Sequence, residues 1–224
     1  MDVCLLLYSA PATHKTVNFN VGVGKVCMFF SIFAETFFMK TVTVKDKTFA
    51  ISISEAEILA RVDVLAAEMS RRLEGKHPIF LTVLNGAFVF AADLVRRMTI
   101  PCEISFVRMS SYSGTSSTGQ VKELIGLKED LEGRTVVVVE DIIDSGLTMK
   151  EMLGLLRKKH PAEVYVASLL VKPDNLKVEM EIDFHCFDIP NDFIVGYGLD
   201  YDGEGRNLRD IYTVVDEKGT SCRK

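Results

Sequence analysis

The stretch that most constrains this chain is residues 136–149, which read VVVVEDIIDSGLTM. Four valines in succession are typical of a strand that is buried on both faces, as in a parallel sheet. Acidic residues, a turn of small residues and the start of an amphipathic helix follow the valines directly. Ligands of open α/β sheets bind at the carboxyl ends of the strands. This stretch therefore predicts carboxylates and free backbone N–H groups together at the mouth of a sheet.

The turn at residues 144–148 has the properties of an anion site. Backbone N–H groups converge where a helix begins, and the helix start carries partial positive charge. Ser145 and Thr148 would add hydroxyl donors. Gly146 would let the backbone approach a ligand closely, because it has no Cβ. We therefore expect a phosphate group to bind here.

Three carboxylates stand within five positions of this stretch. Glu140 and Asp141 come one step before the turn, where sugar hydroxyls or a hydrated Mg²⁺ could be held. The plainer alternative is that Asp144 or Ser145 only caps the following helix. Capping accounts for one residue, however, and leaves the other carboxylates unexplained.

Buried strands alternate with helices along the rest of the chain. A capping box of the S-x-x-E type at residues 54–57 opens the first helix. Alternation of this kind predicts an α/β fold with a mainly parallel twisted sheet flanked by helices, closed by the last strand. The expected helices are 54–73, 87–98 and the one after Gly146, and the other expected strands are 41–45, 48–53, 78–84, 102–109, 120–127, 163–171, 183–187 and 211–215.

Composition excludes several classes of function. At 224 residues the chain can form one domain with a sizeable core. The net charge is -5 and there is no long basic run, which argues against a general nucleic-acid binder. Its five cysteines are scattered without a CxxC pattern, as expected for free thiols in a reducing cytosol. The four histidines lie far apart, so neither a zinc site nor a histidine base is indicated.

Residues 1–38 differ from the rest of the chain. They hold 6 of the 14 phenylalanines and only four charged residues. Their apolar segments are shorter than the roughly 20 residues of a transmembrane helix, and the Met-Asp start lacks the basic residues of a signal peptide. We expect a natural start at Met39. Residues 1–38 would then be an atypical, poorly ordered extension before a domain at 39–224.

Residues 140–148, EDIIDSGLT, resemble the phosphoribosyl pyrophosphate (PRPP) motif of type I phosphoribosyltransferases. The resemblance runs from about Met39 to Asp216 and is strongest to the members that act on hypoxanthine or guanine. Four further segments stand in the family's order: VLNGAFVFAADL, VRMSSYSGTSSTGQVK, VASLLVKPD and FIVGYGLDYDGEGRNL.

The resemblance implies both a fold and a reaction. The fold would be the type I phosphoribosyltransferase sheet with a small hood region. The reaction would be the Mg²⁺-dependent transfer of 5-phosphoribose from PRPP to N9 of a 6-oxopurine, with release of pyrophosphate. The resemblance also implies a cytoplasmic homo-oligomer, a dimer or a tetramer, that needs neither nucleic acid nor membrane.

Roles for the residues of the PRPP motif follow from the same resemblance. Glu140 and Asp141 would hold the ribose hydroxyls, directly or through Mg²⁺. The five residues of the turn would cradle the 5-phosphate: Asp144, Ser145, Gly146, Leu147 and Thr148. Asp144 would also face N7 of the purine, as the general acid/base of the reaction.

The base would be recognised by residues further along the chain. The resemblance places Lys172 as the donor to the purine O6, which would select 6-oxo over 6-amino bases. Phe193 would stack on the base, and the backbone of Ile194 would meet the purine edge. The alternatives are a solvated lysine for Lys172 and ordinary core packing for Phe193.

Four residues would serve the pyrophosphate side of the reaction. Asp200, beside the purine site, would ligate a second Mg²⁺, and Arg206 would contact pyrophosphate. The alternatives are a turn aspartate and a surface arginine. Asn85 and Gly86 occupy the family's pyrophosphate-loop position, where some members carry lysine in place of Asn85.

Residues 110–119, SSYSGTSSTG, predict a mobile loop. Within it, Ser111 and Tyr112 match the family's Ser-Tyr pair, which would close over PRPP and exclude water. The alternative is a disordered loop without a function.

Two rivals remain open at this point. One is an enzyme of the same kind that prefers guanine or xanthine. The other is a PRPP-sensing regulator without catalysis, a class that typically adds a nucleic-acid-binding surface. This sequence shows no added domain or basic face and keeps Asp144, Lys172 and the Ser-Tyr pair. Lys172 and residues 187–206 also disfavour adenine and orotate enzymes.

Overall fold

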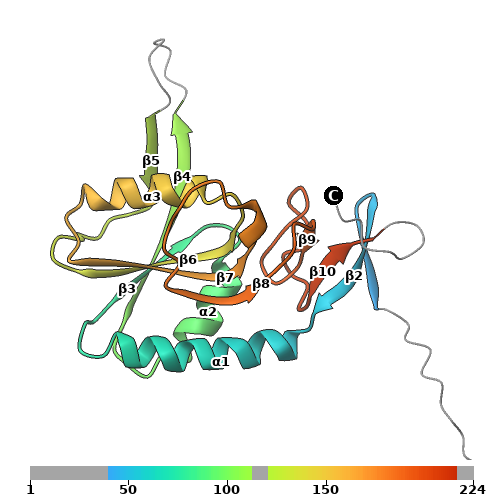
Figure 1. The fold of residues 1–224 in the computed structure, drawn as a ribbon, viewed down its shortest axis with the longest axis horizontal. Helices are drawn as coiled ribbons and strands as arrows, with labels where there is room; N and C mark the ends of the chain where they lie inside the picture. Colours follow the sequence, from blue (N-terminus) through green and yellow to red (C-terminus); the bar gives the residue numbers. More distant parts are fainter. Residues whose placement is uncertain (1–39, 113–120, 216–224) are drawn as a thin grey trace, which may run out of the picture. The chain divides into compact units, whose positions relative to one another are not determined.

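The structure is a computed structural model that describes residues 40–112 and 121–215 (Figure 1). The prediction that residues 1–38 are a poorly ordered extension concerns a part of the chain outside these ranges. The described residues form two sheets, one mostly parallel and one antiparallel.

The larger sheet has six strands in the order β5-β4-β3-β6-β7-β8. Its five strands β4, β3, β6, β7 and β8 pair in parallel, and β5 pairs with β4 in antiparallel fashion. The strands are β3 (Ile79–Val83), β4 (Glu103–Tyr112), β5 (Val121–Ile125), β6 (Thr135–Ile143), β7 (Glu163–Val171) and β8 (Phe184–Asp188). The predicted fold class is confirmed.

Helices cover both faces of this sheet (Figure 1): α1 (Glu55–Arg72) and α2 (Phe88–Val95) lie on one face and α3 (Leu147–Arg157) on the other. The four valines of β6 point alternately to the two sides. Val137 and Val139 pack in the core under α1 and α2, whereas Val136 and Val138 pack in the core under α3. Because both faces of the strand are buried, its sequence does not alternate between apolar and polar residues.

The predicted capping box at the start of α1 is present. The Ser54 side chain accepts a hydrogen bond from the backbone N–H of Glu57, and the Glu57 carboxylate accepts one from the Ser54 N–H at 2.8 Å. Two of the free N–H groups at the helix start are satisfied in this way.

The smaller sheet is antiparallel, with the order β1-β2-β10-β9. It consists of β1 (Thr41–Val44), β2 (Lys47–Ile53), β9 (Ile194–Val195) and β10 (Ile211–Val214). The prediction that residues 211–215 close the main sheet is wrong, because β10 pairs with β2 and β9. Phe49, Val195 and Tyr212 contribute to a separate small core there. This sheet is the expected hood region.

Three boundaries differ by three residues or more from the predicted ones. Strand β6 runs on to Ile143, because its pairing with β7 extends to Val171, so Glu140 and Asp141 lie within the strand rather than after it. Strand β4 includes residues 110–112, which were predicted to be loop. Helix α2 ends at Val95 rather than at residue 98, where tighter turns take over.

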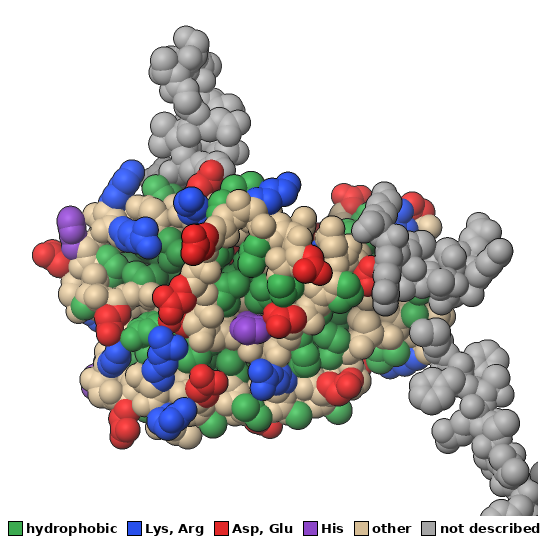
Figure 2. Space-filling view, in the orientation of Figure 1, with side chains coloured by type: hydrophobic (Ala, Val, Ile, Leu, Met, Phe, Trp, Pro, Cys, Tyr) green, Lys and Arg blue, Asp and Glu red, His purple; other side chains and the backbone are tan. Residues whose placement is uncertain are grey.

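Acidic and basic side chains are interspersed over the face of the molecule that Figure 2 shows. Within the described ranges, no helix combines the length and the apolar character that crossing a membrane requires.

Candidate functional site

The candidate site lies where β3, β6 and β7 end, at one edge of the parallel sheet. The residues that follow these strands are Asn85–Gly86, Asp144–Thr148 and Lys172. A cavity of about 320 Å³ opens there, and Glu140, Asp144, Ser145, Gly146 and Thr148 are among its lining residues. Five of the predicted site residues therefore share one cavity.

A left-handed glycine begins α3. Gly146 is the N-cap residue with φ 74°, and a Cβ at this position would lie 2.9 Å from the Val178 side chain. No side chain caps the helix from Gly146 itself, and the Ser145 Oγ only accepts a long hydrogen bond of 3.5 Å from the Leu147 N–H. The first N–H groups of this 11-residue helix thus have little side-chain competition, and Thr148 and Met149 of its first turn line the cavity.

Glu140 and Asp141 form a pair of half-buried carboxylates near the end of β6. Burial, together with hydrogen bonding and charge repulsion from Asp141, holds the pKa of Glu140 well above its ordinary value. Asp141 accepts a hydrogen bond of 2.9 Å from the backbone N–H of Ile142. A cation at this place would relieve the repulsion between the two groups.

Gly86 packs directly against Asp141. A Cβ at Gly86 would lie 1.5 Å from the Asp141 Oδ2, so no other residue fits there without moving the carboxylate. A Cβ at Gly198, where φ is +101°, would likewise lie 2.1 Å from the carbonyl oxygen of Gly86. Three segments distant in sequence, around Asp141, Gly86 and Gly198, therefore meet at close contact.

Asp144 is held by two residues that follow β7. Lys172 Nζ donates to the Asp144 Oδ2 at 3.3 Å, and the Asn175 side-chain amide donates to the Asp144 Oδ1. Lys172 is only 7% exposed, so the alternative of a solvated lysine does not hold. Asp144 lines the cavity and does not cap α3, which also removes the capping alternative for this residue.

Asp200 and Arg206 pair with each other. The Arg206 guanidinium lies 2.6 Å from the Asp200 Oδ1 and also donates to the carbonyl of Gly198 at 2.7 Å. Asp200 accepts a second hydrogen bond from the backbone N–H of Gly203, as a turn aspartate does. Both side chains are about 30% exposed, so they remain open to a ligand.

Phe193 is 43% exposed although it is a large apolar residue. Its ring lies 5.4 Å from Tyr201 in an edge-on arrangement and 6.0 Å from Phe49. Core packing is thus only part of its environment, and ring surface is left free for stacking. Ile194, at the start of β9, is 8% exposed.

Three contacts of the site were not predicted. The hydrogen bond from Asn175 to Asp144 belongs to no sequence motif. The only sequence signal for the close approach of Gly198 to Gly86 is that Gly198 lies in a glycine-rich segment. Arg108 donates to the Asn85 Oδ1 at 2.6 Å, which gives the asparagine of the pyrophosphate-loop position a partner within the chain.

The lid prediction reaches beyond the described part of the structure. Backbone pairing places Ser111 opposite Lys122 and Tyr112 opposite Val121, at the end of the β4–β5 hairpin. The side chains of this pair and residues 113–120 lie outside the described residues.

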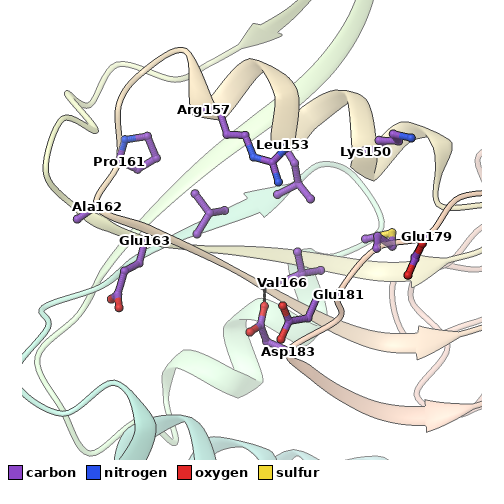
Figure 3. Close-up of a pocket in the computed structure, with 12 residues that line it drawn as sticks. Lys150, Leu153, Arg157, Pro161, Ala162, Glu163, Val166, Glu179, Glu181 and Asp183 are labelled. Atoms are coloured by element: carbon purple, nitrogen blue, oxygen red, sulfur yellow. Dashed lines mark hydrogen bonds between the residues drawn. The ribbon is translucent and has the colours of Figure 1, made fainter.

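A second hollow, of about 420 Å³, lies between α3, the start of β7 and residues 179–183 (Figure 3). Lys150 and Arg157 approach it from α3, and Glu179, Glu181 and Asp183 from the opposite side. None of the predicted site residues lines it.

Comparison with known proteins matches residues 53–202 to the phosphoribosyl transferase domain family. A hypoxanthine-guanine phosphoribosyltransferase of Streptococcus pneumoniae is 39% identical over 168 residues, which are 75% of this chain and 93% of that protein. A hypoxanthine phosphoribosyltransferase of Buchnera aphidicola is 42% identical over 174 residues, which are 76% of this chain and 98% of that protein.

A solved structure agrees with these relatives. The crystal structure of a hypoxanthine-guanine phosphoribosyltransferase from Bacillus anthracis shares 37% sequence identity and superposes with a TM-score of 0.66. The match covers 74% of this chain and 96% of that one.

Proposed function

This chain belongs to the phosphoribosyl transferase family, and on that premise we propose that it is an enzyme of purine salvage. It transfers 5-phosphoribose from PRPP to N9 of hypoxanthine or guanine, giving IMP or GMP and pyrophosphate. The observation that carries this proposal is the pairing of Asp144 with Lys172 beside the helix start of α3. An acid/base, a base-selecting cation and an anion site stand together there.

The turn at 144–148 binds the 5-phosphate. The N–H groups at the start of α3 and the hydroxyls of Ser145 and Thr148 donate to it, and Gly146 keeps the approach open. Glu140 and Asp141 hold the ribose hydroxyls from the adjoining end of β6.

The base lies between Phe193 and the ends of β6 and β7. Lys172 donates to the purine O6 and thereby prefers a 6-oxo base, since a 6-amino group cannot accept that bond. Asp144 takes the proton from N7 as N9 attacks C1 of the ribose. The bond from C1 to the pyrophosphate oxygen breaks, and Arg206 contacts the negatively charged pyrophosphate as it leaves.

Mg²⁺ fits the carboxylates of this site. The raised pKa of Glu140 reflects its burial and the neighbouring Asp141 carboxylate, and a divalent ion would offset the repulsion between the two groups. Among the described residues no group of three or more metal-binding side chains occurs, so PRPP oxygens and water would complete the coordination. Glu140 and Asp141 would hold one ion or its waters and Asp200 a second, and the ions would neutralise the charge of the leaving pyrophosphate.

Three further features belong to the proposal. Ser111 and Tyr112 close over PRPP, and the chain acts as a homo-oligomer in the cytoplasm. These rest on the family resemblance and on the place of the pair at the end of the β4–β5 hairpin.

The regulator without catalysis is the second candidate. The buried Lys172 and its ion pair with Asp144 disfavour it, because PRPP sensing needs neither a base-selecting lysine nor an acid/base. An enzyme that prefers guanine or xanthine would use the same site residues, so only an assay distinguishes it from the proposed enzyme.

The test is an assay of the purified chain with PRPP and Mg²⁺ and each purine in turn. We expect nucleotide formation with hypoxanthine or guanine and little with adenine. Binding of PRPP without nucleotide formation from any base would favour the regulator. A clear preference for xanthine would contradict the assigned substrate.

A further inference from the structure

We propose that Asn175 is a positioning residue that holds the carboxylate of Asp144 in place while Lys172 engages the base. The inference rests on the proposed function, because it assigns Asn175 a part in the proton transfer made by Asp144. It concerns a contact that no motif of the sequence indicates.

The backbone fixes Asn175 beside Asp144. The segment after β7 begins with a hydrogen bond of 2.9 Å from the Lys172 N–H to the Ile143 carbonyl. It is joined again by one of 3.0 Å from the Lys177 N–H to the Ser145 carbonyl. Asn175 ends the 3-10 turn Pro173–Asn175 between these two bonds, so its amide reaches Asp144 from a segment held at both ends.

The two partners of Asp144 take different oxygens. The Lys172 ammonium donates to Oδ2 at 3.3 Å, and the Asn175 amide donates to Oδ1. Lys172 must also serve the purine O6, and a lysine that turns toward the base loosens its contact with the carboxylate. The proposed site gives Asn175 no contact with the base, so its hydrogen bond to Asp144 would persist when the base binds.

Asn175 therefore orients the catalytic carboxylate of Asp144, while Lys172 recognises the purine. A carboxylate that is 46% exposed in its side chain could otherwise rotate as its cation moves away. Misplacing a catalytic group slows the chemical step more than it weakens ground-state binding.

The experiment compares Asn175→Ala with Asp174→Ala. Both truncate a polar residue of the same turn, but Asp174 is exposed and lies outside the proposed site. A hydrogen bond to a charged group corresponds to about tenfold or more in rate. We expect Asn175→Ala to lower kcat by about tenfold, with KM values for PRPP and base within about threefold, and Asp174→Ala to resemble the wild type.

A double-mutant cycle separates positioning from a general loss of structure. In an Asp144→Asn background, the additional Asn175→Ala change should have little further effect on kcat, because the group it positions is already gone. Asn175→Ser, which keeps a donor, should recover part of the rate and covers the case in which the alanine variant fails to fold.

The outcomes are distinct. A wild-type chain that forms no nucleotide contradicts the proposed function itself. A wild-type chain that is active, with Asn175→Ala unchanged in kcat or with equal losses in both Asp144 backgrounds, overturns the positioning role alone.

Discussion

At the scale of one residue, the fold fixes the orientation of the Asp144 carboxylate without any ligand. Its two oxygens accept hydrogen bonds from Lys172 and Asn175, so its orientation is set by neighbours on a different strand connection. Such preorganisation avoids reorganisation at the moment of reaction.

Replacing Asp144 by Asn tests its assigned chemistry. The amide keeps the size of the side chain but cannot take up the proton of N7, so we expect kcat to fall by about 100-fold or more. PRPP affinity should change much less, since the helix start and the hydroxyls proposed to bind phosphate are unaltered. Steady-state kinetics with a separate PRPP titration measure both, and near-wild-type turnover would refute the acid/base role.

Lys172→Ala addresses base selection. In the proposed site the buried Lys172 donates to O6, and its loss would remove the penalty against a 6-amino group. We expect the ratio of kcat/KM for hypoxanthine to that for adenine to fall by at least about tenfold, chiefly through weaker use of hypoxanthine. An unchanged ratio would count against readout of O6 by this residue.

Glu140 gives a prediction about pH and stability. Its pKa is raised above the ordinary value of 4.5 by burial and by Asp141, so the folded chain binds this proton more tightly than the unfolded chain. The free energy of unfolding should therefore fall as the pH rises above the unfolded value. Glu140→Gln removes this pH-dependent loss. In metal-free buffer the free energy of unfolding of the variant should therefore rise relative to that of the wild type as pH increases from about 4.5 to 8.

Thermal unfolding in EDTA at several pH values measures this difference. Glu74→Gln, at an exposed site just after α1, serves as the matched control and should show no such trend. A stability difference between Glu140→Gln and wild type that is the same at every pH would contradict the assignment.

At the scale of elements, the site depends on how closely three connections approach one another. Gly86 follows β3, Asp141 belongs to β6, and Gly198 belongs to the segment after β9. Tyr197 anchors that segment through a hydrogen bond of 2.6 Å from its hydroxyl to Asp93 of α2. The helix after the Gly86 loop is thus tied to the segment that carries the proposed base-binding residues.

Gly86→Ala should disrupt this meeting point. Its Cβ would need the space of the Asp141 carboxylate, which must then leave its backbone hydrogen bond. We expect activity to fall by more than about tenfold and the free energy of unfolding to fall by about 1–3 kcal/mol.

Gly154→Ala is the matched control for this change. It lies in α3 with open space around the added methyl group, so it should stabilise the protein by about 0.5–1 kcal/mol and leave turnover unchanged. Activity assays and chemical denaturation test the pair, and full activity of Gly86→Ala would show that the contact with Asp141 is dispensable.

Part of this arrangement could be predicted because strand order decides it. Asp144 and Lys172 follow β6 and β7, which are parallel neighbours, so their carboxyl ends meet at one edge. The contact between Gly86 and Asp141 could not be predicted, since a glycine in a turn has many possible reasons. Asn175 was missed because its role depends on a bend after Pro173 that no pattern specifies.

At the scale of the whole molecule, the main sheet was predictable, whereas the place of the last strand in the second sheet was not. The valines of β6 favour a strand buried on both faces, which indicates the centre of an α/β fold. Residues 211–214 are equally suited to either sheet, and only long-range pairing with β2 places them in the hood. Choice of partner strand is a property of the whole chain rather than of the segment.

Cys186 offers a measure of how the whole molecule responds to its substrate. It lies in β8 within the core beside α1, where burial raises the pKa of its thiol to about 12. At pH 8 the native thiol should resist alkylation, so it reacts only when the fold opens. Cys102, which is half-buried, should react faster.

Under the proposed function PRPP with Mg²⁺ binds the folded chain, so it should slow this labelling. At 100 times the dissociation constant, ligand binding stabilises the native state by about 2.7 kcal/mol, which is about 100-fold in the population of the open form. Peptide mass spectrometry after timed alkylation separates Cys186 from the other four cysteines. We expect PRPP to slow Cys186 strongly and Cys102 little, because only the former requires global opening. Equal protection of both would show that Cys102 also waits for global unfolding, and no protection of Cys186 would show that the strand beside α1 opens independently of the PRPP site.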